Sequence, residues 1–236
     1  AHLQGASAPA APLRGGTTDV GMIHLAAAPA VSVFPYPAFK LGRDPGGVAA
    51  GDFNGDGNDD LAVTSGSEHL VFIMLGNGQG TFGPDGINFT AGGRVSAGSR
   101  PVWVITLDLN NDGRLDLVTA NIDSDNVQAL LGNGSGGFTS AGNFATGTRP
   151  ETLAAGDFNR DGRPDLVVAQ RTSSELSILI GNGDGTFRPQ VRIPVAGGPR
   201  AAAVADLKGD GFVDLAPANV LGDTVSVLLG NGDGTF

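Results

Sequence analysis

The sequence predicts an all-β fold, a β-propeller of four blades in which each blade is a sheet of four antiparallel strands. First, an aspartate-rich loop motif recurs four times, and short apolar runs flank each copy. Second, the last repeats are 49 residues long, which suits a blade that cannot bury its faces alone. Third, the 236 residues include 39 glycines and 14 prolines, and no long stretch has helical periodicity.

The chain is organised around the loop of residues 52–60, Asp-Phe-Asn-Gly-Asp-Gly-Asn-Asp-Asp. Oxygen-bearing side chains stand at its first, third, fifth and ninth positions, and glycine stands at its sixth. Calcium is a hard cation that prefers six to eight oxygen ligands. A glycine at the sixth position permits the sharp turn, and a backbone carbonyl at the seventh usually completes the shell. The loop is therefore predicted to bind Ca²⁺.

Three further loops repeat this pattern, and their first aspartates follow at intervals of 56, 49 and 49 residues. The fourth loop departs from it, because Lys208 replaces the asparagine. We therefore expect three complete calcium sites and a fourth that Lys208 puts in question. The predicted ligands, with the seventh residue contributing its carbonyl, are Asp52, Asn54, Asp56, Asn58 and Asp60; Asp108, Asn110, Asp112, Arg114 and Asp116; Asp157, Asn159, Asp161, Arg163 and Asp165; and Asp206, Asp210, Phe212 and Asp214.

These loops differ from the EF-hand, whose twelfth position carries a bidentate glutamate between two helices. Short apolar runs such as residues 48–50 and 61–64 flank the loops and suit strands. Each calcium loop is therefore placed between the first and second strands of its blade. The residues at the twelfth position are Val63, Thr119, Val168 and Pro217.

The strands of each blade can be followed in order. A proline lies seven residues before each loop. It suits the start of the first strand, where its missing N–H costs no hydrogen bond between strands. The second strand is expected to begin at the apolar residue after the loop. A fourth strand is expected around an apolar residue thirteen positions before the loop of the next blade. The prolines are Pro45, Pro101, Pro150 and Pro199, and the fourth-strand residues are Phe39, Val95, Phe144 and Ile193.

The third strand of each blade ends in a glycine-rich turn of the type Leu-Gly-Asn-Gly-Asp-Gly-Thr-Phe, at residues 75–82, 131–138, 180–187 and 229–236. Such turns look like phosphate cradles, but no helix follows to present its N-terminus. Asn-Gly and Asp-Gly supply the positive φ of hairpin turns, and we assign that role. The longer first interval places a protruding loop around residues 83–86.

Three segments are predicted. Residues 1–30 form an Ala/Pro/Gly-rich tail, flexible or docked through the apolar patch at 20–25. Residues 31–44 hold a strand that completes the last blade, in the same chain or a neighbouring one. Residues 45–236 hold the four repeats.

The loop and the glycine turn together resemble the FG-GAP/VCBS repeats of integrin-type β-propellers, over roughly residues 31–236. This resemblance implies calcium-loaded blades of the kind found in extracellular adhesion proteins, lectins and accessory domains of secreted enzymes. Members of the family usually close a ring of about seven blades, whereas four repeats are present here.

Composition excludes several classes. The net charge of −10 argues against nucleic acid as a partner, and no apolar run is long enough for a membrane span. The absence of cysteine excludes a disulfide scaffold, so any cross-link that stabilises the fold must come from bound metal. Millimolar free calcium is typical outside cells, so we expect an extracellular or cell-surface location.

An enzyme is not expected. His69 is the one histidine within the repeats, in a turn where it is expected to be solvated. The regularly placed carboxylates are assigned to metal, which leaves no evident acid/base pair.

Three functions stay open. The favoured one is a structural subunit of a surface or fibrous assembly, self-associating through strand complementation, because blade four ends after its third strand while residues 37–42 supply a fourth. The alternative is an adhesion module that binds a glycan or surface protein; here Trp103 is expected in the core and Tyr36 exposed. The third is an accessory domain of a secreted enzyme. Asn88 and Asn133 match the N-glycosylation acceptor pattern, and their modification is left open.

Overall fold

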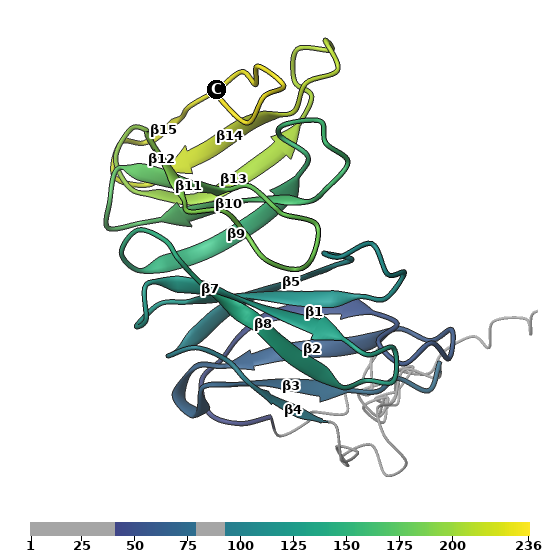
Figure 1. The fold of residues 1–236 in the computed structure, drawn as a ribbon. Helices are drawn as coiled ribbons and strands as arrows, with labels where there is room; N and C mark the ends of the chain where they lie inside the picture. The colour runs from purple at the N-terminus through teal and green to yellow at the C-terminus, as the bar shows by residue number, and fades with distance from the viewer. Residues whose placement is uncertain (1–40, 79–92) are drawn as a thin grey trace, which may run out of the picture. The chain divides into compact units, whose positions relative to one another are not determined.

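A computed structural model describes residues 41–78 and 93–236 of the chain (Figure 1). All of these residues belong to one compact unit, Pro37–Phe236. The regular structure of the described residues is β-strand except for one 3₁₀ helix, Gly66–Glu68. The predicted all-β fold is confirmed. No helix in this described part is long and apolar enough to cross a membrane.

The strands form four antiparallel sheets, which are the four blades of the predicted β-propeller. In each blade the strands pair in chain order, from the first, inner strand to the last, outer one. Blade one contains β1 (Pro45–Gly51), β2 (Asp60–Ser65), β3 (Leu70–Met74) and β4 (Arg94–Ser96). Blade two contains β5 (Pro101–Leu107), β6 (Asp116–Asn121), β7 (Asn126–Gly132) and β8 (Phe138–Ala145). Blade three contains β9 (Pro150–Gly156), β10 (Asp165–Gln170), β11 (Glu175–Leu179) and β12 (Val191–Pro194). Blade four contains β13 (Pro199–Ala205), β14 (Asp214–Asn219) and β15 (Thr224–Val225).

The prolines predicted to open the inner strands do so in all four blades. The pairing register shifts next to each of them, as between Pro101 and Trp103. This is consistent with a proline that has no N–H to donate to the ladder. The expected fourth-strand residues Val95, Phe144 and Ile193 lie in β4, β8 and β12.

The second strands begin one residue earlier than expected. The ninth loop residue already pairs with the end of the inner strand, as Asp60 does with Gly51. The strand starts were predicted from the runs of apolar residues. Such a run cannot include the charged aspartate with which each second strand begins.

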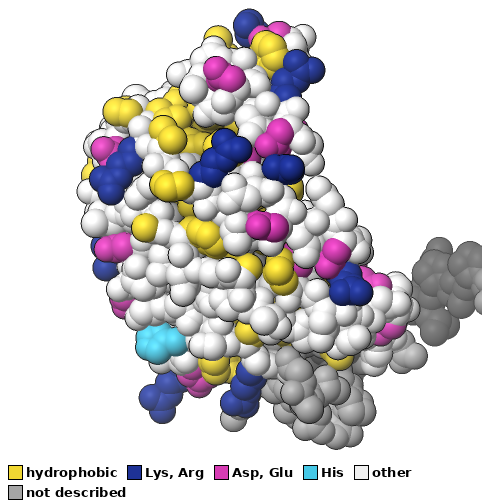
Figure 2. All heavy atoms as spheres, viewed as in Figure 1, with side chains coloured by type: hydrophobic (Ala, Val, Ile, Leu, Met, Phe, Trp, Pro, Cys, Tyr) yellow, Lys and Arg dark blue, Asp and Glu magenta, His cyan; other side chains and the backbone are white. Residues whose placement is uncertain are grey.

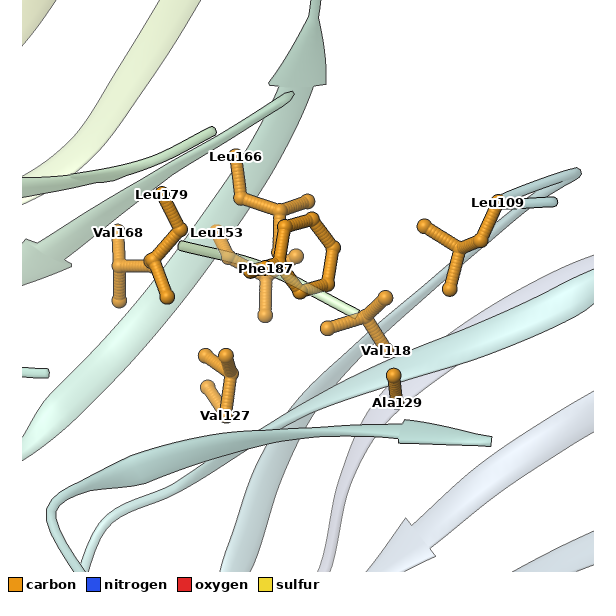
Figure 3. Close-up of a cluster of buried hydrophobic side chains, with 10 residues drawn as sticks. Leu109, Val118, Val127, Ala129, Leu153, Leu166, Val168, Leu179 and Phe187 are labelled. Atoms are coloured by element: carbon orange, nitrogen blue, oxygen red, sulfur yellow. The ribbon is translucent and has the colours of Figure 1, made fainter. Parts of the chain in front are cut away.

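The core lies in the junctions between successive blades, where consecutive inner strands are in contact. One cluster joins blades one and two, one joins blades two and three, and one joins blades three and four. Figure 3 shows the middle cluster, in which Val118 and Val127 of blade two face Leu153, Leu166 and Phe187 of blade three. Each blade therefore buries its apolar residues against its neighbours rather than within itself.

Blade four is the irregular one. Its sheet has three strands, and β15 is two residues long, followed by an isolated bridge between Leu215 and Leu228. Pro217 lies inside β14 and has no N–H to donate; its carbonyl accepts the N–H of Ser226 at 3.1 Å. A ladder that lacks this donor is weaker, which explains why β15 is short.

Some expectations fall outside the described residues: the tail, most of the 31–44 strand including Phe39, Tyr36, the loop around residues 83–86, and Asn88. Asn133 lies exposed in the glycine turn after β7.

Candidate metal centres

The four candidate loops connect the inner strand of each blade to its second strand. In the first three loops the first aspartate is half-buried, the fifth-position aspartate is exposed, and the ninth is fully buried. In the fourth loop Asp206 is exposed, while Asp214 is fully buried. In every loop the ninth aspartate is therefore the aspartate that lies inside the protein, away from solvent.

The carboxylate of the first aspartate is wrapped by the backbone of its own loop. The Oδ1 atom of Asp52 accepts the N–H of Gly55 at 2.7 Å and that of Asp56 at 3.2 Å. The Oδ2 atom accepts the N–H of Gly57 at 2.8 Å. The bond from the sixth-position glycine recurs in all four loops. This carboxylate therefore sets the loop's curvature.

Two residues of each loop have left-handed backbone conformations. The sixth-position glycine was predicted to do so, and its φ lies between 77° and 84° in the four loops. The fourth-position residue does so as well, although it is Asn111 in loop two and Arg160 in loop three, with φ of 57° and 59°. Residues with a Cβ are uncommon there, so these two are held by the loop around them.

The ninth aspartate acts as a buried clamp. Asp60 accepts the N–H of Phe53, at the start of its loop, at 2.9 Å and the N–H of Gly76, after the third strand, at 2.7 Å. A carboxylate has enough lone pairs to accept both bonds and still face a cation. Asp116, Asp165 and Asp214 make the same two bonds, at 2.7–2.9 Å. Each clamp ties the loop to the turn that follows the third strand of the same blade.

The electrostatics of the loops favour a cation. Burial raises the pKa of Asp60, and the negative carboxylates of Asp56 and Asp52 raise it further, against the two backbone hydrogen bonds that lower it. The pKa values of Asp116 and Asp165 are raised from the same causes. A positive ion beside these carboxylates would relieve both the desolvation and the mutual repulsion.

The residues of the first three loops fit calcium by their chemistry and order. Every predicted donor is an oxygen, and the three carboxylates are close enough to influence one another's charge. Among the described residues, however, no three His, Asp or Glu side chains already stand together as a metal cage. The first and fifth carboxylates instead accept N–H groups of the loop.

The fourth loop carries a cation of its own. The Nζ atom of Lys208 lies 2.6 Å from Oδ2 of Asp210. In loops one to three the corresponding carboxylate accepts a side-chain N–H from asparagine. The hydrogen bond and the charge of Lys208 lower the pKa of Asp210, so the ammonium competes for a carboxylate that a metal would use.

The second-position loop residue was not singled out from the sequence, yet in blades one to three it joins the loop to the next blade. The N–H of Phe53 is held by Asp60, and its carbonyl accepts the N–H of Gly136 in the turn of blade two at 2.8 Å. Its ring packs edge-on against Phe138, with centroids 5.5 Å apart. Phe158 makes the same contacts with Gly234 and Phe236 of blade four. The available signal was an apolar residue at the second position of every polar loop.

The glycine turns have a second role besides their turn geometry. The positive φ values expected there are present, for example at Gly134 and Gly183. The first glycine of the turn also lies against the loop of its own blade. A Cβ on Gly132 would collide with the carbonyl oxygen of Leu115, the eighth loop residue, and the same holds for Gly181 and Gly230.

The structure tests two expectations about single side chains, and the first is confirmed. His69 is exposed in its turn, and its Nδ1 atom also accepts the N–H of Arg100 at 2.9 Å, which links blade one to the segment that enters blade two. Trp103 was expected in the core, and that was wrong. It lies in β5, but its side chain is 40% exposed and lines a cavity of about 570 Å³ with Thr152, Arg200 and Asn219.

Comparisons with known proteins agree with this architecture. The family model described as an FG-GAP-like repeat matches residues 52–119, 108–168 and 157–216. The chain is similar to an Agrocybe aegerita lectin that specifically recognises non-reducing terminal N-acetylglucosamine, with 22% identity and a TM-score of 0.54 over 79% of this chain and 50% of that one. It is also similar to a protein from Lactobacillus plantarum, with 13% identity and a TM-score of 0.53 over 81% of this chain and 57% of that one.

These two likenesses concern the fold, and this chain spans only 50% and 57% of the two solved chains. No curated protein matches the sequence.

Replacing the buried aspartate should destabilise the chain even without metal. In Asp165→Asn the side chain keeps one acceptor and turns an NH₂ group towards a backbone N–H, which costs about 1–3 kcal/mol. Urea denaturation in excess EGTA would measure this. The exposed Asp161→Asn is the matched control and should change stability by less than about 0.5 kcal/mol under the same conditions. Equal effects of the two substitutions would contradict the clamp.

Proposed function

Because the chain belongs to the FG-GAP-like repeat family, we propose that it is a non-catalytic, calcium-stabilised extracellular protein that serves as a structural subunit of a surface or fibrous assembly. The observation that supports the assembly role is the strand count of the blades. Among residues 41–78 and 93–236 the sheet of blade four has three strands, whereas each of the other three sheets has four. An unpaired edge is a template for a strand from another chain.

Calcium is proposed as the stabilising ion. The support is a set of three loops with all-oxygen donors, in which burial and repulsion raise the pKa of the ninth carboxylate. The ligands would be the first, third, fifth and ninth side chains with the seventh carbonyl. The ion would supply charge balance, and no substrate chemistry is assigned to it.

Chelation should lower the melting temperature by many degrees. An ion that binds only the native state at ~100 times its dissociation constant adds about 2.7 kcal/mol for each site. Differential scanning calorimetry with calcium and with excess EGTA would measure the change, with magnesium as the specificity control. An identical melting curve in EGTA would refute calcium stabilisation.

The Lys208→Asn substitution should tighten the fourth site and raise stability in calcium. It removes the ammonium that pairs with Asp210 and supplies an oxygen at the third position. Lys208→Ala is the matched control, because it removes the charge without adding a ligand. Calcium titration by calorimetry should give one additional tight site for the asparagine variant only. Four equal sites in the wild type would show that the lysine does not weaken the loop.

Self-association is proposed to use the strand predicted within residues 31–44. In blade three, β12 pairs with β11 along four residues, and residues 224–227 of blade four offer the equivalent edge. The donated strand would come from a neighbouring chain, which makes a head-to-tail contact.

Removing residues 1–40 should therefore abolish assembly while the blades still fold. Sedimentation velocity in calcium would compare this variant with the full chain across a concentration series. The full chain should form larger species, and the shortened chain should stay monomeric with a cooperative melt. A full chain that remains monomeric at high concentration would overturn the assembly role.

The second candidate function is glycan binding at Trp103. Trp103 lines the cavity together with Arg200 and Thr152, and an indole can stack on a sugar ring while guanidinium and hydroxyl groups can bond its hydroxyls. On a glycan array, Trp103→Ala should then lose a signal that the exposed-strand control Val191→Ala keeps. No signal from the wild type would remove this candidate.

A further inference from the structure

The outer strand of blade two, β8, has an edge that lacks the usual protection against pairing. The strand is eight residues long and contains no charged residue. By contrast, β4 has three residues including Arg94, and β12 has four including Arg192 and Pro194. Short length, charged side chains and proline keep edge strands from pairing with other chains. Among the outer strands of the described residues, β8 is the one without any of these features.

The edge of β8 is open to solvent. Within the described residues β8 pairs with β7 alone, and its residues Thr139, Ser140, Asn143 and Ala145 are exposed. In an antiparallel ladder, alternate residues direct their N–H and C=O groups away from the paired strand. Figure 2 shows mostly uncharged surface where β8 runs. The edge therefore offers backbone donors and acceptors that suit an added strand.

Beside this edge, the junction between blades two and three differs from its neighbours. In the junctions on either side, the phenylalanine of the glycine turn packs against a loop phenylalanine, Phe53 or Phe158. The loop of blade two has Leu109 instead, and the ring of Phe187 packs edge-on against Phe144 of β8, with centroids 5.1 Å apart. An aromatic pair therefore extends from the junction core, where Figure 3 shows Phe187, to the outer strand.

A cavity of about 420 Å³ lies against this aromatic pair. Its wall consists of residues 143–145 of β8 and residues 187–190, which lead into β12. Successive residues of a strand point to opposite faces of the sheet. A cavity lined by three consecutive residues of β8 therefore borders the edge of that strand and is not confined to one face.

Hydrogen bonds fix the wall of the cavity that belongs to blade three. The N–H of Arg188 donates to the carbonyl of Ile180 at 2.8 Å. The side-chain carbonyl of Gln190 accepts the hydroxyl of Ser177, whose oxygen accepts an N–H of Gln170 at 2.6 Å. A preformed wall reduces the ordering that a ligand must impose when it binds. The cavity is therefore suited to selecting a ligand by shape.

Arg188 supplies a positive charge at this cavity. Its side chain is exposed and forms no ion pair with any described residue, whereas the nearby Arg192 is paired with Glu175 at 3.7 Å. The cavity wall contains no aspartate or glutamate. A guanidinium can bind a carboxylate through two parallel N–H groups. The charge therefore favours a ligand that carries a carboxylate close to an apolar group.

We infer that β8 and the adjacent cavity bind an extended peptide segment of a partner protein. The peptide adds a strand to the edge of β8, an apolar side chain enters the cavity beside Phe144 and Phe187, and a carboxylate binds Arg188. The two side chains are two residues apart in the peptide, because alternate residues of a strand share one face. Backbone hydrogen bonds supply affinity and the cavity supplies selectivity. This site goes beyond the proposed assembly role, which concerns blade four.

Synthetic peptides and isothermal titration calorimetry test this inference on the full chain in calcium. The parent peptide is acetyl-Thr-Val-Thr-Phe-Thr-Glu-Thr-amide, and it should bind. Replacing its Phe by Ser should weaken binding at least about tenfold, because the apolar contact with the aromatic pair is lost. Two analogues carry N-methyl groups, one on Val, Phe and Glu and the other on the Thr residues that follow them. One analogue alone should lose binding, because only alternate N–H groups of an added strand face β8.

A charge exchange tests the role of Arg188. Arg188→Glu should weaken binding of the parent peptide roughly tenfold, because attraction becomes repulsion. A peptide with Lys in place of Glu should recover this loss on the variant. Arg171→Glu is the matched control, since Arg171 is exposed on the same blade and does not line the cavity. Melting curves should show that both variants are folded.

Four results would overturn the inference. A parent peptide that does not bind at millimolar concentration, or two methylated analogues that bind as well as the parent, would show that β8 accepts no strand. Equal losses in Arg188→Glu and Arg171→Glu would show a general effect of added negative charge. A glycan-array signal that Arg188→Glu abolishes, without any peptide binding, would assign the cavity to a sugar.

Discussion

The buried aspartate at the end of each loop is the constraint on which the structure depends. Its two oxygens hold the backbone of the loop's second residue and the backbone that follows the third strand. In blades one to three the side chain of the second residue packs into the junction with the next blade. In two of these blades its carbonyl also accepts an N–H from the turn of the next blade. One carboxylate therefore fixes a loop, a sheet and a junction together.

Loop chemistry and blade packing are coupled for this reason. The clamp carboxylate is desolvated and is repelled by the first and fifth carboxylates of its loop, which raises its pKa in blades one to three. An ion that balances these charges would stabilise the loop, and the bonds of Phe53 and Phe158 would pass that stability to the following blade. In the fourth loop the ammonium of Lys208 pairs with the carboxylate of Asp210, so a side chain already balances part of this negative charge.

The sequence predicted the features that repeat within a single blade. The positions of nearly all strands follow from three repeated features. These are the periodic aspartates, the prolines at the start of the inner strands and the glycine turns. It did not reveal the role of Phe53 or the exposure of Trp103, because each depends on a neighbouring blade that the local pattern does not specify. The weak ladder of blade four follows from Pro217, whose missing donor matters only once β15 is known to pair with β14.

The most direct measurement of the coupling is amide hydrogen exchange with and without EGTA, resolved at the loop of one blade and the turn of the next. If the loop and the junction are joined through its second residue, chelation should release the amides of Phe53 and Gly136 together, and those of Phe158 and Gly234 together. Faster exchange in the loops with unchanged protection of Gly136 and Gly234 would contradict the coupling.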